Sequence, residues 1–117
     1  LEQLTRLIQT IKKTGRKLIV CGDFNMPKRS PFYTSFVKAS GLIDLFKAKS
    51  SSTYHQSFFG IADITMERID YIFATELKLI SIDHVFTQKV AIDDSTHDFL
   101  SDHIGLRARF QIQYSQA

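Results

Sequence analysis

The chain has 117 residues, 44% of them hydrophobic, and a formal net charge of +3. That length allows a single domain, and the apolar fraction excludes an intrinsically disordered chain. No apolar run approaches the roughly 20 residues that span a bilayer, and the slight positive charge permits an anionic partner without requiring one.

The first fifteen residues predict an amphipathic helix. Apolar residues recur at the spacing of three and four that marks one helical face, at Leu4, Leu7, Ile8 and Ile11. Gly15 follows as a natural C-terminal stop. Neither an initiator Met nor a capping residue stands ahead of Leu1, so we expect the chain to be a fragment whose upstream part is missing.

A short strand and a second helix are predicted next. Residues 17–21 are too few and too β-branched for a helix and predict a buried strand. Cys21, the one cysteine, is then a buried, unreactive thiol without an internal disulfide partner, which leaves the compartment open. Ser30 and Pro31 supply an N-cap and a first-turn proline for a helix that Gly41 closes.

The second half of the chain predicts strands. After a mixed loop over residues 41–60, residues 67–74 alternate with a period of two, and residues 78–86 are expected to form the neighbouring strand. Residues 88–100 are a predicted polar loop. In residues 104–112 apolar and polar side chains alternate again, so one face packs and the other meets solvent. Helices followed by strands indicate an α/β (α+β) fold.

Two polar residues follow the first predicted strand. Asp23 and Asn25 are two residues apart, so on an extended chain their side chains point the same way, roughly 6.5–7 Å apart. A carboxylate that takes a proton from water, beside an amide that holds a phosphate oxygen, suits hydrolysis at phosphorus. An Asx-type turn explains the same two residues without any chemistry, and on their own they favour the turn.

The second half contributes further acids and a histidine. Asp70 lies in a strand whose other members are expected to be buried, where an unpaired charge is costly. Either Arg68 on the same face or a histidine from another strand would pair with it. Asp102 and His103 precede the last strand, where a bending loop allows both to serve one site. Together these residues predict a metal-assisted phosphodiesterase site.

The candidate residues lie in three short segments, which occur along the chain in this order: Gly22-Asp23-Phe24-Asn25, Arg68-Ile69-Asp70-Tyr71-Ile72 and Ser101-Asp102-His103. This order resembles the C-terminal half of the endonuclease/exonuclease/phosphatase superfamily, and the resemblance spans almost the whole chain. It implies a deoxyribonuclease I-like fold, with this chain forming half of a two-sheet β-sandwich flanked by helices. Residues 1–117 would then be the C-terminal fragment of one domain whose N-terminal half is missing.

The resemblance also implies a role for each matched residue. Asp23 would orient or deprotonate the attacking water, and Asn25 beside it would contact phosphate. Asp70 would hold His103 in its working tautomer, and His103 would stabilise charge on the phosphoryl oxygens. Asp102 would lie at or near a divalent metal, Mg²⁺ or Mn²⁺.

The chain departs from the family pattern in its first half. Members also carry an Asn and a metal-binding Glu there, and this chain has neither position. Loss of a principal carboxylate weakens Mg²⁺ binding, and a sheet without its packing partner exposes apolar surface. We therefore expect a hydrolase of phosphodiester or phosphomonoester bonds whose isolated fragment is inactive.

Three more residues are weaker candidates for substrate binding. His55 lies in a Thr-aromatic-His pattern similar to one in some bacterial members. Lys28 and Arg29 directly follow the Asp23 segment, where they would touch a substrate phosphate. A solvent-exposed position with no role explains each of them as well.

Two other functions compete with the enzyme. The alternative is a non-catalytic nucleic-acid- or phosphate-binding module of the same fold. The joint presence of all the candidate catalytic and metal-binding residues argues against it: Asp23, Asn25, Asp70, Asp102 and His103. The other possibility is a domain that binds nucleic acid through its positive charge alone. The sequence argues against it, because it lacks the interleaved aromatic and basic residues on which bases stack.

The expected partner is a phosphate-ester substrate, with nucleic acid favoured over phospholipid or phosphorylated small molecules. Nothing in the sequence indicates membrane insertion. The cytoplasm is favoured as the compartment, and export stays open because the residues ahead of Leu1 decide it.

Overall fold

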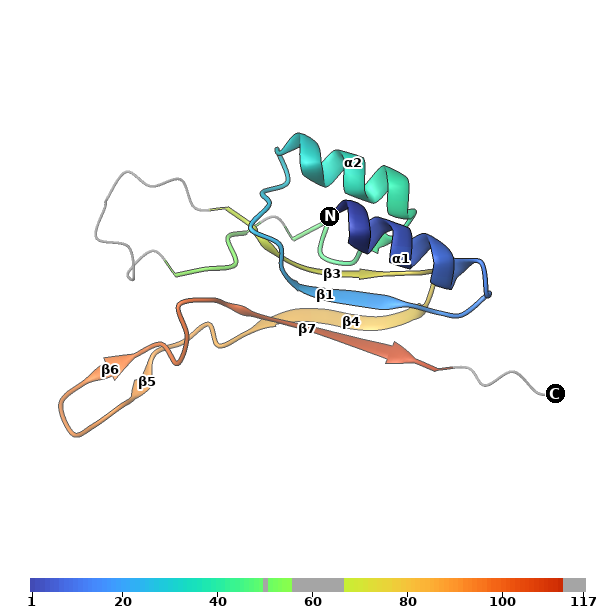
Figure 1. Cartoon of the computed structure of the whole chain (residues 1–117). Coiled ribbons are helices and arrows are strands. Elements are labelled where there is room, and N and C mark those ends of the chain that lie inside the picture. The colour runs from blue at the N-terminus through green and yellow to red at the C-terminus, as the bar shows by residue number, and fades with distance from the viewer. Residues whose placement is uncertain (50, 56–66, 113–117) are drawn as a thin grey trace.

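The computed structural model describes residues 1–49, 51–55 and 67–112. Two helices, α1 (Glu2–Lys12) and α2 (Pro31–Ser40), cover one face of a three-stranded antiparallel sheet (Figure 1). Its strands are β1 (Ile19–Asp23), β3 (Asp70–Ala74) and β2 (Ile43–Asp44), in the order β1-β3-β2. The predicted mixed α/β class, with helices first and strands later, is confirmed.

A second antiparallel sheet lies on the other side of the first. It consists of β4 (Lys78–Val85) and β7 (Gly105–Gln111), and β7 contacts β3 (Figure 1). The hairpin of β5 (Val90–Ala91) and β6 (His97–Asp98) projects beyond these layers. In the part of the chain that the structure describes, neither helix is long and apolar enough to cross a bilayer.

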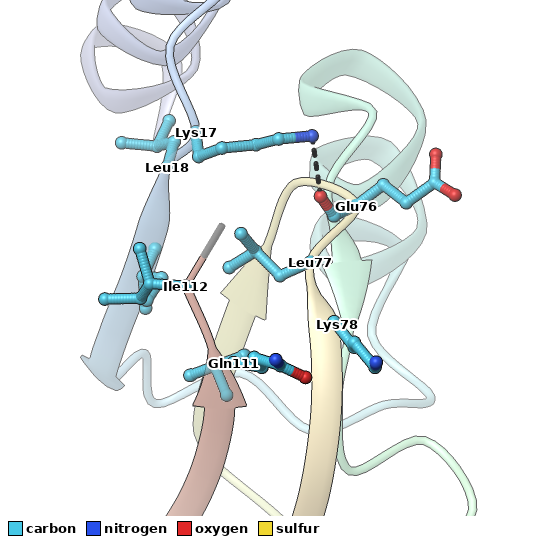
Figure 2. A pocket seen from close by; sticks show the side chains of 9 residues that line it. Lys17, Leu18, Glu76, Leu77, Lys78, Gln111 and Ile112 are labelled. Atoms are coloured by element: carbon cyan, nitrogen blue, oxygen red, sulfur yellow. Dashed lines mark hydrogen bonds between the residues drawn. The ribbon is translucent and has the colours of Figure 1, made fainter. Parts of the chain in front are cut away.

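The two sheets diverge at the end where β1 begins. A cavity of about 680 Å³ opens there between the start of β1, the β3–β4 turn and the end of β7. Leu18, Leu77 and Ile112 lie around this opening, and the Lys17 ammonium crosses it to donate to the carbonyl of Glu76 at 2.8 Å (Figure 2). The side chains of Ile19, Ile80 and Ile112 near this end are largely exposed. This end of the sandwich therefore presents uncovered apolar surface.

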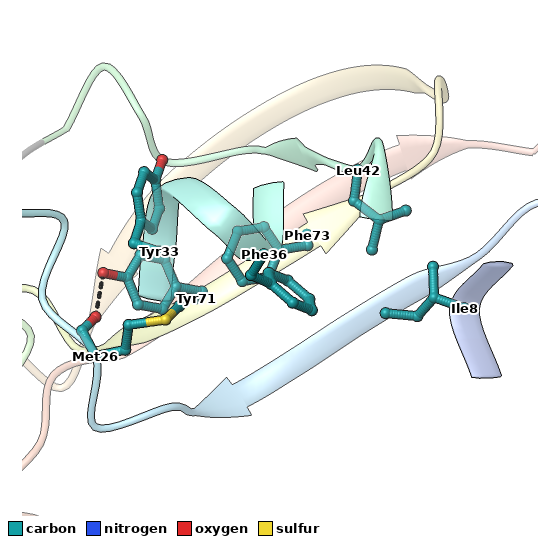
Figure 3. Close-up of a cluster of buried hydrophobic side chains, with 7 residues drawn as sticks. All are labelled: Ile8, Met26, Tyr33, Phe36, Leu42, Tyr71 and Phe73. Atoms are coloured by element: carbon teal, nitrogen blue, oxygen red, sulfur yellow. Dashed lines mark hydrogen bonds between the residues drawn. The ribbon is translucent and has the colours of Figure 1, made fainter. Parts of the chain in front are cut away.

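The hydrophobic core lies between the helices and the first sheet. Its buried members are Ile8, Met26, Tyr33, Phe36, Leu42, Tyr71 and Phe73 (Figure 3). Phe24 packs against this cluster, with its ring edge-on to Phe73 at a centroid distance of 5.3 Å. Phe24, between Asp23 and Asn25, therefore turns into the core.

The second helix matches its prediction. Ser30 caps it by accepting a hydrogen bond from the amide of Phe32, Pro31 begins it, and Gly41 ends it at φ 66°. The first helix also forms, but the predicted apolar face is only partly correct. Ile8 is buried in the core, whereas Leu7 is largely exposed.

Four predictions about the strands and the loop at 88–100 are wrong. β1 lies at a sheet edge and its residues are largely exposed. Val20 packs toward the helices, so Cys21 points to the opposite face and is exposed, not buried. The strand at residues 78–86 pairs with β7 and not with β3. The predicted polar loop at 88–100 contains the β5–β6 hairpin.

The remaining two predictions concern the middle and the end of the chain. The loop at 41–60 contains the short strand β2, and its residues 50 and 56–60 lie outside the described part. The last strand is confirmed as β7. Its burial alternates, with Leu106, Ala108 and Phe110 less exposed than the residues between them.

Candidate active site

Two carboxylates meet at the end of the first sheet. In the antiparallel register of β1 and β3, Asp23 lies directly opposite Asp70. Residues that face each other in this way have Cβ atoms about 4.5–5.5 Å apart on the same side of the sheet. Asp23 ends β1 and Asp70 begins β3, so strand pairing itself brings the two acids to one rim.

The third group comes from the segment just before β7. The Nδ1 atom of His103 lies 2.7 Å from Oδ2 of Asp70, and its Nε2 atom lies 3.9 Å from Oδ2 of Asp23. The Asp70 side chain is 17% exposed, that of His103 31% and that of Asp23 41%. The imidazole is therefore anchored on the more buried carboxylate and faces the more open one.

The electrostatics favour a charged imidazole. Burial lowers the pKa of His103, but the hydrogen bond to Asp70 and the charges of Asp70, Asp102 and Asp23 raise it more, and the net pKa lies above the ordinary 6.5. Since Nδ1 is bonded to Asp70, the Nε2–H of the imidazolium is the donor left on the open side.

The segment that follows Asp23 is a turn and not an extended chain. The amide of Asn25 donates to Oδ1 of Asp23 at 2.8 Å, which is the Asx-type turn that the sequence allowed as an alternative. Asn25 has φ 48°, in the left-handed region. The expectation that both side chains point the same way from an extended strand is therefore wrong. The turn occupies Oδ1 of Asp23, and Oδ2 is the oxygen that faces His103.

Arg68 is not the partner of Asp70. Its guanidinium is buried and forms two hydrogen bonds with the carboxylate of Asp44, at 2.9 and 2.7 Å. Of the two partners that the sequence offered Asp70, the structure places the histidine beside it. The carboxylate of Asp102 is exposed, while its backbone carbonyl accepts a hydrogen bond from the amide of His55 at 2.7 Å.

The weaker candidates are His55, Arg29 and Lys28. The buried ring of His55 stacks on Phe99 at a centroid distance of 3.5 Å, and its Nε2 is 3.1 Å from the carbonyl oxygen of Phe86. It thus faces the base of the β5–β6 hairpin. Arg29 forms an ion pair with Glu67, and Lys28 is exposed. Their contact with substrate stays a prediction.

A divalent cation fits part of this group. Ligand atoms of Asp23, Asp70 and His103 lie within 4.8 Å of one another. However, Nδ1 of His103 is held by Asp70, so Nε2 is the ring nitrogen left to face a cation. Mg²⁺ and similar hard cations take carboxylate oxygens. Of this group, the exposed carboxylate of Asp23 therefore suits such a cation, with Asp70 and His103 forming a hydrogen-bonded pair; Asp102, also exposed, is not one of the three residues whose ligand atoms converge.

One residue of the site escaped the sequence-based prediction. Thr53 is fully buried, and its hydroxyl oxygen accepts hydrogen bonds from the amides of Ile69 and Asp70. The signal that could have found it is its place at the start of the Thr-Tyr-His pattern, from which only the histidine was singled out.

The raised pKa of His103 predicts a pH-dependent stability. The folded state holds the proton more tightly than the unfolded chain, so the stabilisation is fully present below 6.5 and is lost as the pH rises through the folded-state pKa. We expect the free energy of unfolding of the full-length protein to exceed that of a His103→Gln variant by more at about pH 6 than at about pH 9. Urea unfolding with a chelator present measures this. A difference that is constant or grows with pH would contradict it.

Comparisons with known proteins cover the part of the chain that holds these residues. A model described as "Endonuclease/Exonuclease/phosphatase family" matches residues 1–103, which include every candidate named above. A solved structure, an endonuclease/exonuclease/phosphatase family protein from Leptotrichia buccalis C-1013-b, is similar in fold with a TM-score of 0.63 and 24% identity. The similarity covers 92% of this chain but only 42% of that one, so this chain spans less than half of that relative's length. No curated protein matches significantly.

Proposed function

Because the chain belongs to the endonuclease/exonuclease/phosphatase family, we propose that it is the C-terminal half of a metal-dependent domain that hydrolyses phosphate esters. Membership supports a nuclease- or phosphatase-type hydrolase at the level of the family. The observation that carries the proposal is the imidazole of His103, hydrogen-bonded to Asp70 on one side and facing Asp23 on the other.

Each of these groups has a defined task in the proposed reaction. Asp70 holds the imidazolium of His103, whose Nε2–H donates to a phosphoryl oxygen and stabilises the charge that develops there. Asp23, with Oδ1 fixed by the Asn25 amide, uses Oδ2 to orient the attacking water or to take its proton. The side chain of Asn25 would contact the phosphate from the same turn.

The proposed metal is Mg²⁺ or Mn²⁺, in keeping with a family that generally depends on a divalent metal. The carboxylate of Asp102 would help to hold it, together with ligands from the other half of the domain. Such a cation supplies Lewis-acid stabilisation of the phosphoryl oxygens. Nucleic acid is the favoured substrate, because the exposed Lys28 and the mostly exposed Arg29 flank the Asp23 turn and the chain carries a net positive charge.

An upstream half of the domain would pack on the end of the sandwich opposite Asp23. The apolar cavity at the opposite end from Asp23 and the exposed side chains around it are surface that a soluble domain normally covers (Figure 2). The solved relative is more than twice as long as the matched region, which provides room for such a second half. We assign the upstream half of the domain as the segment that covers this end.

The test is hydrolysis of a DNA duplex and of a chromogenic phosphodiester by the full-length protein. We expect turnover with Mg²⁺ or Mn²⁺, loss of turnover with EDTA, and recovery when the metal is restored. The isolated 117-residue chain is expected to be inactive under the same conditions, because it supplies only some of the metal ligands.

Each arm of this test has a result that contradicts the proposal. Turnover that persists in EDTA would refute the metal dependence. Turnover by the isolated chain would refute the assignment as half of a domain. Tight phosphate or nucleic-acid binding by the full-length protein without cleavage would favour the non-catalytic binding module.

A further inference from the structure

We propose that Thr53 is a positioning residue of this site, which holds Asp70 and His103 in hydrogen-bonding register by contacting both of their segments. The proposal rests on the proposed function for its catalytic consequence. The geometry that carries it does not depend on the reaction.

The side chain of Thr53 binds the start of β3. Its Oγ1 accepts hydrogen bonds from the amides of Ile69 and Asp70, at 3.0 and 3.1 Å, and no part of the residue is exposed. Its own amide donates to the carbonyl of Glu67 at 3.3 Å. A single buried hydroxyl therefore fixes the backbone at the residue that carries the carboxylate.

The backbone of the same segment binds the segment that carries the imidazole, just before β7. The carbonyl of Thr53 accepts from the amide of Ile104 at 2.8 Å, and the amide of His55 donates to the carbonyl of Asp102 at 2.7 Å. Tyr54 and His103 face each other in the resulting antiparallel bridge. Residues 53–55 thus lie between the two segments and hydrogen-bond to both.

This arrangement matters because the Asp70–His103 bond is short and charge-assisted. Such bonds weaken steeply when distance and angle depart from their optimum. A valine at position 53 keeps the shape but removes the acceptor of two adjacent amides, so the start of β3 must shift to find other partners. The shift would separate Asp70 from His103 without removing either side chain.

The experiment compares three variants in the full-length protein. Thr53→Val is expected to lower kcat about 10- to 100-fold, the range typical for groups that orient a functional ligand, with KM changed less than about twofold. Thr53→Ser keeps the hydroxyl and should recover most of this loss. Thr75→Val is the matched control. Its hydroxyl accepts from the amide of Leu18 at 3.0 Å at the other end of β3, so it should lower stability while sparing kcat.

A spectroscopic measurement reads the hydrogen bond directly. The Nδ1 proton of His103 should give a far-downfield ¹H resonance, identified by its loss in a His103→Gln variant. We expect this resonance to broaden or move upfield in Thr53→Val and to persist in Thr53→Ser and Thr75→Val. This readout needs no turnover, so it decides the role of Thr53 even if hydrolysis, and with it the proposed function, fails.

A double-mutant cycle tests whether Thr53 acts through Asp70. In an Asp70→Asn background, adding Thr53→Val should cost little further kcat, because the interaction that Thr53 positions is already lost. Full additivity of the two losses would overturn the proposal. So would an unchanged downfield resonance in Thr53→Val, or an equal change in Thr75→Val.

A measurement on the wild type covers the case in which Thr53→Val does not fold. The amides of Ile69 and Asp70 should exchange slowly with deuterium, since a buried hydroxyl holds both of them. Exchange of these two amides as fast as that of exposed loop amides would overturn the proposal.

Discussion

Replacing His103 by Ala in the full-length protein is expected to lower kcat by about 100- to 1,000-fold, the usual cost of losing a preorganised donor to developing charge. The imidazole lies between both carboxylates, 2.7 Å from Asp70 and 3.9 Å from Asp23. Its removal takes away the donor that we propose for the phosphoryl group and leaves the partly buried Asp70 without the imidazole that it binds. Turnover of a phosphodiester with Mg²⁺ is the measurement.

The matched control for this variant is His97→Ala. His97 is an exposed residue of β6, so its loss should leave both turnover and stability within experimental error. Circular dichroism and a thermal melt show whether His103→Ala keeps its fold. If a folded His103→Ala protein retained turnover within about fivefold of the wild type, the imidazole would not be the donor that stabilises the transition state.

Asp70→Asn tests the effect of the Asp70 charge while the imidazole of His103 is kept. Asparagine keeps the size of the side chain and still accepts a hydrogen bond, but it no longer carries the charge that favours the imidazolium. The pKa of His103 should then fall, because burial alone lowers it and Asp70 supplies the largest opposing effects. We therefore expect turnover to decrease most at alkaline pH, where the imidazole of the variant is neutral.

The largest expected effect on stability comes from Arg68→Met, which should lower the free energy of unfolding by about 3–5 kcal/mol. The side chains of Arg68 and Asp44 are each 2% exposed and are joined by two hydrogen bonds. The guanidinium also lies over the ring of Tyr71, 4.7 Å from its centroid. Methionine fills much of the space but leaves a buried carboxylate without its counter-charge, which is the costly half of a broken buried pair.

The hydrogen bond from Tyr33 does not compensate Asp44 for the loss of Arg68. Its hydroxyl donates to Oδ2 of Asp44 at 2.7 Å. Burial, together with the hydrogen bond to Asp44 and the charge of that residue, raises the pKa of Tyr33 to about 12, so the phenol stays a donor at all moderate pH values. Two neutral hydrogen bonds, from the Tyr33 hydroxyl and from the Phe46 amide at 3.2 Å, then remain for a carboxylate that had four, and they do not offset the loss of the guanidinium.

Arg107→Met is the matched control for Arg68→Met. Arg107 pairs with Asp83 at 2.8 Å across β4 and β7, but the two side chains are 60% and 34% exposed. Solvent screens such a pair, and we expect a loss of at most about 1 kcal/mol. Urea unfolding of both variants measures the difference. Equal losses, or a loss below about 1 kcal/mol for Arg68→Met, would show that the buried pair is not a main source of stability.

The sequence by itself determined those features that depend on residues close together in the chain. Helix α2 begins where a serine hydroxyl can cap it and ends where a glycine accepts a left-handed conformation, and both conditions involve neighbours within a few residues. The alternation in β7 likewise follows from the period of an extended chain. Asp23, Asp70 and His103 could be predicted to share one site because the three segments that carry them occur in the order that resembles the family.

Only the tertiary structure decided which distant groups became partners. The sequence offered Asp70 both Arg68 and a histidine, and the guanidinium instead lies on Asp44, a residue of β2. The sequence predicted a buried Cys21, but the edge position of its strand exposes the thiol. It also predicted the strand at 78–86 beside β3, but this strand pairs with β7. Thr53 gained its role from two amides sixteen and seventeen residues away. Pairings of this kind depend on the register and layering of whole strands, which no local spacing encodes.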